Sequence, residues 1–420
     1  MELELRTHHA RSTSLADEPA AATWIRAVTF GFHEPTYTDE ALALWLRTVV
    51  AMSVRMRGVH DLDTAGLRDP DQPVGTLGSW DTTVNIGGSL LPANAISDVT
   101  TRASHRRRGI LRRLMTADLT DAADRGLPLA ALTVSESGIY RRFGFGPAVQ
   151  ANAVKVRTDA SFGITSTITG RVELVDRDVY LEHVEALFAV FHSRTSGSVA
   201  RHPSGSDALS GTDLQTGKLQ HTFRYALHLD DDGQCDGAVA WKIEDDNALV
   251  IRDLIVPDPA VGIMLWDFLG RHDLVTTVTQ RRARVDDALP YALLEPDVYT
   301  VEGRSDFLWL RVLDVSAVLE ARTYLVDGTV TLAVTDDMGF ATGTYRLTVV
   351  HGEGTVHRTS NVAEELDSDV LLDVAALGSV LLGGVSVSTV AAAGHIRGPG
   401  TADLAALMVC RTAPALITPF

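Results

Sequence analysis

The sequence is poor in the features that mark secreted, membrane-spanning and metal-rich proteins. It contains only two cysteines, Cys235 and Cys410, and they lie far apart in the chain. Two isolated cysteines exclude a disulfide framework and a cysteine-rich metal site, and they fit a reducing compartment. No apolar run reaches the roughly 18 residues of a spanning helix, and the N-terminus has no signal-peptide pattern. We therefore expect a cytoplasmic protein with no metal ion and no membrane partner.

Positive charge is also scarce. The chain has 37 Lys and Arg residues against 54 Asp and Glu residues, which gives a net charge of -17. Such a surface repels nucleic acid and anionic membranes at long range and attracts cations, so we expect no nucleic-acid partner. The acidity is compatible with a polycationic substrate, but it also keeps proteins soluble without any other role. Charge alone does not decide between these two interpretations.

What the chain does have is length and alternating local structure. Its 420 residues, 45% of them hydrophobic, exceed what one core usually holds, so two or three domains are expected. From Ser79, two β-rich runs surround a Gly-Gly turn, an amphipathic helix follows from Gly109 to about Arg125, and a buried strand starts after Pro128. This alternation predicts a mixed α/β sheet with an active turn at the carboxyl end of a strand.

A second segment repeats this plan. Residues 247–274 again read as strand, loop and apolar helix, with Asp253 in the place of Asp98. In that alignment Arg106, Arg107 and Arg108 stand opposite Val261, Gly262 and Ile263. The second copy therefore keeps the scaffold and loses the charges at the turn, so only the first copy is expected to bind a nucleotide.

The remaining segments differ in character. The Ser/Gly-rich stretch 193–213 reads as a long loop within the second unit. From about Arg322 the chain is rich in predicted strands and then carries two helical runs around LLDVAALGSVLLGGVSVSTVAAAG. This last third is predicted to be a separate α+β unit.

An arginine-rich turn precedes the first predicted helix. In DVTTRASHRRRGILRRLM, three arginines and Gly109 come directly before Ile110 and Leu111, which start the helix with free N–H groups. Helix N-termini and arginines bind phosphates, such as the pyrophosphate of coenzyme A, and glycine lets the backbone approach them. If the strand at Val99 to Thr101 splays from its neighbour, its free backbone groups can bond the pantetheine arm.

The same arginines also fit a solvated helix start or a nucleic-acid patch. A basic cluster at a strand-to-helix turn of an acidic protein favours a small phosphorylated ligand over both alternatives.

Acetyl transfer from a thioester to an amine requires a proton for the departing thiolate and a base for the amine. Tyr140, in SESGIYRRFGFG, stays protonated at neutral pH because tyrosine titrates near about 10, although it also reads as a packing aromatic. For the base, Glu136, a histidine and the α-carboxylate of Phe420 compete. Most chain ends are frayed, but the apolar ending APALITPF favours docking, either as an active carboxylate or as an inert plug.

These residues resemble a known family. DVTTRASHRRRGILRRLM and ALTVSESGIYRRFGFGPA are similar to the enhanced intracellular survival (Eis) acetyltransferases, members of the GCN5-related N-acetyltransferase (GNAT) superfamily. Further matching segments are VGTLGSWDTTV, RARVDDALPYALLEPDVYTVEGRSDFLWLRVLDV, LLDVAALGSVLLGGVS and the terminal Phe420, so the resemblance covers the whole chain.

The resemblance implies an α/β (α+β) architecture with two tandem GNAT-like domains with mixed sheets, followed by a sterol-carrier-like α+β domain. The implied boundaries are 1–158 for the catalytic domain, 159–305 for the degenerate domain and 306–420 for the last domain. It also implies a homohexamer.

The resemblance further implies acetyl-CoA as cosubstrate and multi-site acetylation of aminoglycoside amines. Other polyamines and protein lysines are alternative acceptors. Tyr140 would be the general acid, and the Phe420 carboxylate would act as base or amine positioner. The implied acetyl-CoA channel is lined by Val99, Thr101, Arg106, Arg107, Gly109, Ile110 and Ser135. The implied acceptor pocket contains Glu34, which would hold a cationic amine, and Phe32 and Trp45, for which simple packing is the alternative.

The sequence departs from the family pattern at a few positions. Ala103 stands where the family often has proline, Thr101 replaces an apolar residue, Ser137 replaces a usual glycine, and Pro419 precedes the terminal residue. None of these changes removes a charge or a donor that the implied mechanism uses. A different class also stays open, namely a lipid or sterol carrier with a vestigial acetyltransferase fold, although the intact turn from Arg106 to Gly109 argues against it.

Overall fold

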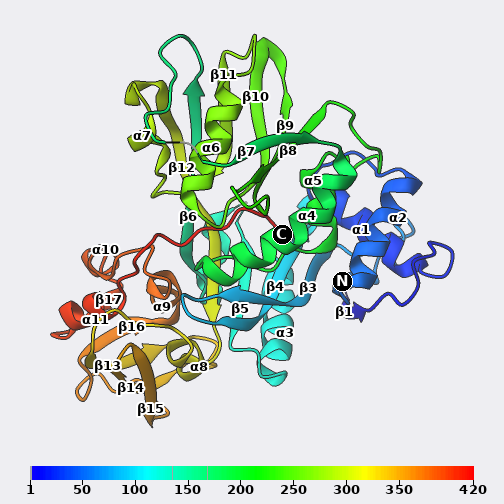
Figure 1. The fold of residues 1–420 in the computed structure, drawn as a ribbon. Helices are drawn as coiled ribbons and strands as arrows, with labels where there is room; N and C mark the ends of the chain where they lie inside the picture. The colour runs from blue at the N-terminus through cyan, green and yellow to red at the C-terminus, as the bar shows by residue number, and fades with distance from the viewer. Residues whose placement is uncertain (1, 135, 168) are drawn as a thin grey trace.

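Two β-sheets organise the protein, one of twelve strands and one of five strands among the described residues (Figure 1). The structure is a computed structural model, and it describes residues 2–134, 136–167 and 169–420. No helix within these ranges is long and apolar enough to cross a membrane.

The first part of the chain supplies one half of the large sheet. Its strands are β1 (Leu3–His8), β2 (Arg55–Asp61), β3 (Gly75–Asn85), β4 (Leu90–Thr101), β5 (Leu129–Thr133) and β6 (Gly146–Arg157). Its α-helices are α1 (Pro19–Gly31), α2 (Asp39–Ala51) and α3 (Ile110–Asp124). Short 3-10 turns lie at Ala103–His105, Ser137–Ile139 and Arg141–Phe143.

The second part supplies the other half. Its strands are β7 (Arg171–Val175), β8 (Phe223–Leu229), β9 (Cys235–Ile243), β10 (Ala248–Ile255), β11 (Thr277–Ala283) and β12 (Tyr299–Val312). Its α-helices are α4 (Arg177–Arg194), α5 (Pro203–Leu209), α6 (Pro259–Gly270) and α7 (Leu289–Ala292), and 3-10 turns lie at Asp245–Asn247 and Pro296–Val298.

The last part forms the small sheet and its helices. Its strands are β13 (Gly328–Thr335), β14 (Gly343–Val350), β15 (Glu353–Ser360), β16 (Val370–Asp373) and β17 (Ile396–Arg397), in the order β15-β14-β13-β16-β17. Its helices are α8 (Val315–Glu320), α9 (Val374–Val380), α10 (Val387–Ala392) and α11 (Thr401–Leu407). The predicted separate α+β unit is confirmed.

The hairpin and helix expected from the sequence are present. β3 and β4 pair antiparallel around the Gly-Gly turn, where Gly87 has a φ of 89°. α3 starts and ends within one residue of the predicted limits, and it buries Ile110, Leu114 and Leu119 against the sheet because apolar residues recur at helical spacing.

The large sheet joins the two repeats edge to edge. Its order is β1-β2-β3-β4-β5-β12-β6-β11-β10-β9-β8-β7. β4 pairs with β5 in parallel, as β10 pairs with β11, and a helix connects each pair. The predicted repeat of strand, loop and helix is therefore confirmed. β12 pairs with β5 and β6, so it fuses the halves and runs across residue 305. The exact domain boundaries stay a prediction.

The stretch 193–213 is more ordered than its composition suggests, so the prediction of a plain long loop was wrong. It contains α5, and Arg177 holds this helix by donating to Asp207 at 2.7 Å and to the Ser210 carbonyl at 3.2 Å. Before the helix, the chain exchanges backbone hydrogen bonds with the end of β3, including Asn85 N–H to Ser198 O at 2.9 Å. These contacts come from segments far away in sequence, which local composition does not reveal.

The part of the chain that holds the small sheet packs closely against the large sheet. Gly146 on β6 approaches the Ala375 carbonyl on α9 so closely that a Cβ there would lie 1.9 Å from that oxygen. Arg311 on β12 forms a buried ion pair with Asp336, in which the one nitrogen Nη2 donates to both carboxylate oxygens at 2.7 Å. The last domain therefore contacts the large sheet directly, at β6 and at β12.

The C-terminal tail after α11 crosses back over the middle of the molecule, where it appears in red (Figure 1). Asp286 accepts from the Ala413 N–H at 2.7 Å, Arg284 donates to the Ala413 carbonyl at 2.9 Å, and Arg201 donates to Thr418 Oγ1 at 3.0 Å. The tail is therefore docked between the two halves of the large sheet, as its apolar sequence predicts.

Candidate functional site

The first strand pair opens at its carboxyl end. β4 and β5 pair only from Ala93 with Leu129 to Ile96 with Leu132 in the described residues, although β4 continues to Thr101. A β-bulge at Asp98, with a φ of 54°, bends β4 at this point. Val99 to Thr101 therefore lie beside an open gap, which matches the predicted splay.

The arginine-rich turn follows directly and takes two left-handed residues. Arg107 has a φ of 62° and Gly109 a φ of 76°, and α3 begins at Ile110 without a side-chain cap. Left-handed residues in such a turn can point backbone N–H groups toward one side, where they bind an anion. The first N–H groups of α3 add the positive end of the helix dipole.

A buried histidine anchors this turn. His105 Nε2 lies 3.1 Å from Asp61 Oδ2, and its Nδ1 lies 2.8 Å from Ser104 Oγ. Asp61 also accepts from Arg68 at 2.9 Å. The turn is thus fixed to β2 before any ligand binds.

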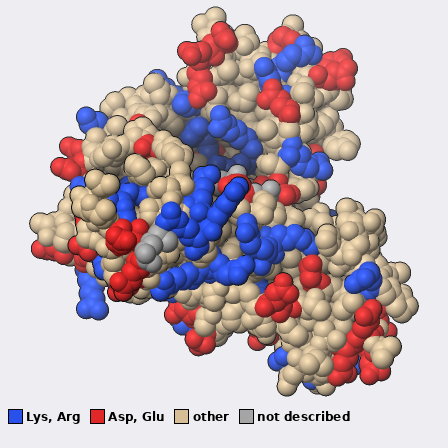
Figure 2. Space-filling view, turned by 180° about the vertical axis from the view of Figure 1, so that it is seen from behind, with Lys and Arg blue, Asp and Glu red and all other residues tan. Residues whose placement is uncertain are grey.

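One cavity of about 900 Å³ gathers most of the predicted donor residues. It is lined by the splayed strand, the turn and the start of α3, and Arg112 and Arg142 add further positive charge. The predicted residues on its wall are Phe32, Val99, Thr101, Arg106, Arg107, Gly109, Ile110 and Tyr140. Ser135, also predicted here, lies outside the described residues. Figure 2 shows Lys and Arg side chains gathered in and around a hollow near the centre of this face.

Tyr140 closes one side of the cavity. Its side chain is buried and packs edge-on against Phe145, with ring centroids 6.2 Å apart. Burial, and secondarily the nearby Glu136 carboxylate, raises the pKa of Tyr140 to about 12. The phenol therefore carries its proton at any physiological pH.

The C-terminal residue lies at the end of β5, where β4 and β5 separate. Thr133, the last residue of β5, donates its hydroxyl to one terminal oxygen of Phe420 at 2.6 Å. The Phe420 ring packs edge-on against Trp80, with centroids 5.9 Å apart. Phe420 is not on the wall of the large cavity, so the chain end and the arginine-rich turn contact different parts of the splay.

Two further carboxylates, Glu34 and Asp98, lie close to Tyr37 and to each other. Glu34 accepts from the Tyr37 hydroxyl at 3.1 Å, and Tyr37 stacks on Trp45 with an interplanar angle of 7°. Burial, with a smaller contribution from Glu34, raises the pKa of Asp98 to about 6. Glu34 is thus close enough to Asp98 to contribute to the raised pKa of Asp98.

The other predicted acceptor residues are placed by α1 and α2. Phe32 is 43% exposed, and it follows Gly31, whose Cβ position lies against Thr100 on β4. Trp45 is half-buried and packs on the same hydrophobic cluster as Phe420. Phe32 thus belongs to the wall of the large cavity, whereas Trp45 stacks on Tyr37 and packs against the cluster that Phe420 also joins.

Sequence reasoning missed several neighbours of the chain end. Trp80 and Thr133 contact Phe420, and His202 lies edge-on to Trp80 at 6.3 Å. Burial, and then Arg201, lowers the pKa of His202 to about 4, so its ring is neutral. No local motif marks these residues, because the tail, β3 and the segment before α5 meet only in the folded protein.

The comparisons with known proteins agree with this arrangement. Family models for an acetyltransferase (GNAT) domain match residues 15–148 and 197–312, and a sterol carrier protein domain model matches residues 315–417. An uncharacterized N-acetyltransferase of Streptomyces griseus is 32% identical over 87% of this chain and 88% of its own length. N-acetyltransferase Eis of Mycobacterium tuberculosis is 31% identical over 74% of this chain and 76% of its own length. The crystal structure of Eis1 from Mycobacterium abscessus matches with a TM-score of 0.78 at 27% identity, over 100% of both chains.

The fold and the site together therefore define a GCN5-related N-acetyltransferase with two tandem acetyltransferase domains. Within that class, the chain belongs to the Eis family of N-acetyltransferases.

Proposed function

We propose that the protein transfers the acetyl group of acetyl-CoA to a primary amine at the splay between β4 and β5. The observation that carries this proposal is that one cavity is lined by both the phosphate-binding turn and the Tyr140 side chain. A donor held by the turn would extend along the splayed strand toward the tyrosine.

The residues present fit acetyl-CoA. Arg106 and Arg107 supply charge for its pyrophosphate, and the left-handed Gly109 allows the backbone N–H groups to turn toward it. The gap beside Val99 to Thr101 supplies unpaired backbone groups for the pantetheine amides. A volume of about 900 Å³ is suited to a ligand of this size.

Tyr140 would act as the general acid. When the amine nitrogen attacks the thioester carbonyl carbon, a C–N bond forms and the C–S bond breaks. The departing thiolate takes the phenolic proton, which Tyr140 retains because its pKa is about 12.

The Phe420 carboxylate would hold the amine and receive its proton, directly or through a water molecule. Thr133 fixes this carboxylate at the end of β5, beside the gap where the amine must approach. Glu136, the competing base, lies on the wall of the donor cavity instead. This position supports Phe420 over Glu136 for the acceptor amine.

The acceptor class is predicted from the family resemblance as aminoglycosides or other polyamines. The carboxylates of Glu34, Asp98 and Phe420 support binding of at least one cationic amine near the opening. Protein lysines are the alternative acceptor, supported by the exposure of Glu34. Mass spectrometry of candidate proteins, run beside an amine panel, distinguishes the two.

The test is release of free CoA from acetyl-CoA across a panel of aminoglycosides, polyamines and simple primary amines. Tyr140→Phe is expected to lower kcat by about 100-fold or more, with little change in the affinity for acetyl-CoA. Tyr291→Phe is the matched control, because Tyr291 is 91% exposed on α7. Wild-type protein that releases no CoA with any amine, or Tyr140→Phe activity equal to wild type, would refute the proposal.

A homohexamer in the cytoplasm is also proposed from the family resemblance. Light scattering after size-exclusion chromatography tests the assembly, and six chains per particle is the expected result.

A further inference from the structure

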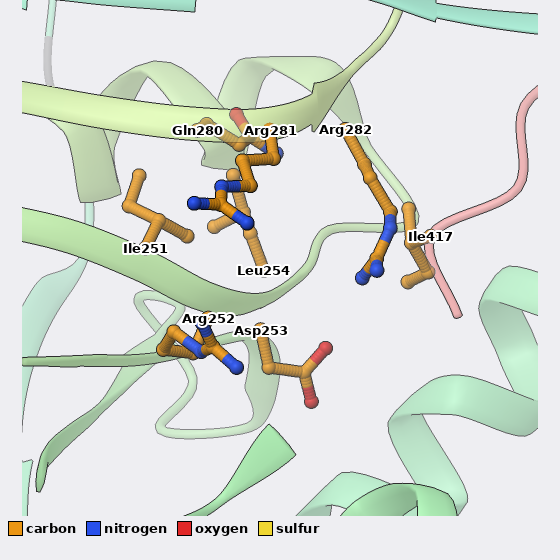
Figure 3. Close-up of a pocket in the computed structure, with 8 residues that line it drawn as sticks. All are labelled: Ile251, Arg252, Asp253, Leu254, Gln280, Arg281, Arg282 and Ile417. Carbon is orange, nitrogen blue, oxygen red and sulfur yellow. The ribbon is translucent and has the colours of Figure 1, made fainter. Parts of the chain in front are cut away.

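Three arginines meet at the opening of the second strand pair. Arg252 comes from β10, and Arg281 and Arg282 come from β11. Figure 3 shows Arg281 between the two strands, Arg252 beside Asp253 on the other side of the β10 ribbon, and Arg282 beside Ile417 of the C-terminal tail. All four of Arg252, Arg281, Arg282 and Ile417 line one recess. The second copy thus lost its arginines at the turn but carries others at the splay.

Two β-bulges place these side chains. The register of β10 against β9 shifts between Ile251 and Asp253, so Arg252 is the extra residue. The register of β11 against β6 shifts between Gln280 and Ala283, so Arg281 and Arg282 occupy the second bulge. Bulges redirect side chains and are enriched beside binding sites.

The three arginines lack counter-charges. Of the carboxylates in the described ranges, none lies within 4.0 Å of their guanidinium groups, and Arg252 Nε is buried without a hydrogen-bond partner. Asp253 is nearby, but it is engaged by Arg201 at 2.8 and 2.9 Å and by the Tyr180 hydroxyl at 2.8 Å.

The other nearby carboxylate, Glu244, is paired with Lys242 at 2.7 Å. Burial, followed by Arg252 and Arg281, lowers the pKa of Arg282 to about 10, against an opposing effect of Asp253. Uncompensated positive charge of this kind favours an anionic ligand.

The cluster lies next to the proposed acetyl-transfer centre. The Arg282 guanidinium stacks on Phe307 at 5.1 Å from the ring centroid, and the Phe307 carbonyl accepts from the Val134 N–H at 3.2 Å. Val134 follows Thr133, which holds Phe420. From the other side, Ile417 lines the arginine recess only three residues before the terminal carboxylate.

The recess is small. It measures about 30 Å³, which admits a group of one or two water-sized atoms, such as the oxygens of a carboxylate. Three residues of extended chain span at most about 10 Å, so this recess and the Phe420 carboxylate lie within the reach of one small molecule.

We propose that Arg252, Arg281 and Arg282 bind a carboxylate of the acceptor, so that the preferred substrate is a primary amine carrying a carboxylate up to about 10 Å from its nitrogen. This inference rests on the proposed acetyl transfer to a primary amine, and it favours a carboxylate-bearing acceptor over the polycationic acceptors that the family resemblance predicts. The amine end faces the carboxylates at the first splay, and the anionic end faces the guanidinium groups at the second. A polycationic acceptor would place an ammonium group against three uncompensated arginines, which like-charge repulsion disfavours.

The experiment compares three amines of equal length: ω-aminooctanoate, aminooctanol and diaminooctane. Their far ends are anionic, neutral and cationic. Calorimetric titration into the full-length protein is expected to rank ω-aminooctanoate first, by about tenfold or more over aminooctanol, because charge-assisted hydrogen bonds contribute roughly 1.5–3 kcal/mol. The same ranking is expected in kcat/KM for CoA release.

Arg281→Gln and Arg282→Gln are expected to reduce the preference for ω-aminooctanoate over aminooctanol by about tenfold, whereas Arg282→Lys retains part of it. Arg271→Gln is the matched control, since Arg271 belongs to the same domain and pairs with Asp267 at its surface. Thermal melting of each variant reports whether it folds.

The outcomes separate the two proposals. CoA release from all three amines without a preference for the anionic one overturns the carboxylate site and leaves acetyl transfer standing. Tight binding of ω-aminooctanoate, lost in Arg282→Gln, without CoA release from any amine supports the carboxylate site and overturns acetyl transfer. Equal binding of the three amines, or a preference that the glutamine variants retain, also contradicts the carboxylate site.

Discussion

The two strand-turn-helix units share a backbone arrangement, but they differ in the groups that lie at the start of the helix. In the first, α3 begins after the left-handed Gly109 with no side-chain cap, so its N–H groups can meet a ligand. In the second, α6 begins with Pro259, and the Asp258 side chain accepts from the Ala260 N–H at 2.9 Å. A carboxylate of the protein itself therefore fills the position that an anion would take.

The difference shows that two units can share a gap between their parallel strands and still present different groups at the turn. Both parallel strand pairs part at their carboxyl ends, beyond Ile96 in β4 and beyond Ile251 in β10. The first gap adjoins a cavity of about 900 Å³, whereas at the second gap Ile417 of the tail lines a recess of about 30 Å³. The same tail ends in the Phe420 carboxylate beside the first gap, so one segment contacts both copies.

The largest effect is expected at this tail. Appending two glycines after Phe420 moves the terminal carboxylate away from Thr133, and we expect kcat/KM for amines to fall by about 100-fold, because positioned acid-base groups contribute about that much. A steady-state assay of CoA release measures it.

The same two glycines added at the N-terminus serve as the control. Full activity with the C-terminal extension would contradict the proposed role of the Phe420 carboxylate.

A smaller effect is expected at the turns. Arg106→Ala is expected to weaken acetyl-CoA binding by about tenfold, because one charge-assisted contact to a phosphate is lost. Ile263→Ala is its matched control, since Ile263 occupies the corresponding region at the start of α6. Calorimetric titration with acetyl-CoA checks both. Equal weakening in the two variants would contradict the division between a binding copy and a silent copy.

The last prediction concerns folding stability instead of activity, at the two matching aspartates. The pKa of Asp98 is about 6 in the folded protein, above its ordinary 3.8, so folding stability decreases as pH rises from about 4 to 6. Asp98→Asn is therefore expected to be more stable than wild type above pH 6 by on the order of 2 kcal/mol, with the difference vanishing below about pH 4.

Asp253→Asn is the opposite control, because it leaves the buried Arg201 without its bidentate partner and should destabilise the protein. Urea unfolding at several pH values measures both variants. A pH-independent difference for Asp98→Asn would contradict the raised pKa.

The strand, turn and helix start of the proposed donor site could be predicted from the sequence because they are close together in the chain. Strand, turn and helix start all lie between Asp98 and Leu111, and local rules for bulges, glycine and helix ends apply to them. The tandem repeat was predictable for the same reason, since strand, loop and helix recur in one order.

The acceptor side depends on long-range contacts and was only partly predictable. Trp80, Thr133 and His202 come together with Phe420 from four separate segments. In the sequence, the arginines of β10 and β11 look like ordinary strand residues. They line one recess only because each strand has a β-bulge at that point. The order of the stretch 193–213 likewise arises from hydrogen bonds to β3 and to Arg177.

The most direct test of the central claim is the stoichiometry of acetyl-CoA binding to the full-length protein. Because α3 presents free N–H groups beside arginines and α6 is capped by Asp258, a calorimetric titration is predicted to give one acetyl-CoA per chain. Arg106→Ala should weaken that single binding event. Two acetyl-CoA molecules per chain, or one whose affinity Arg106→Ala leaves unchanged, would contradict the assignment of the donor site to the first copy.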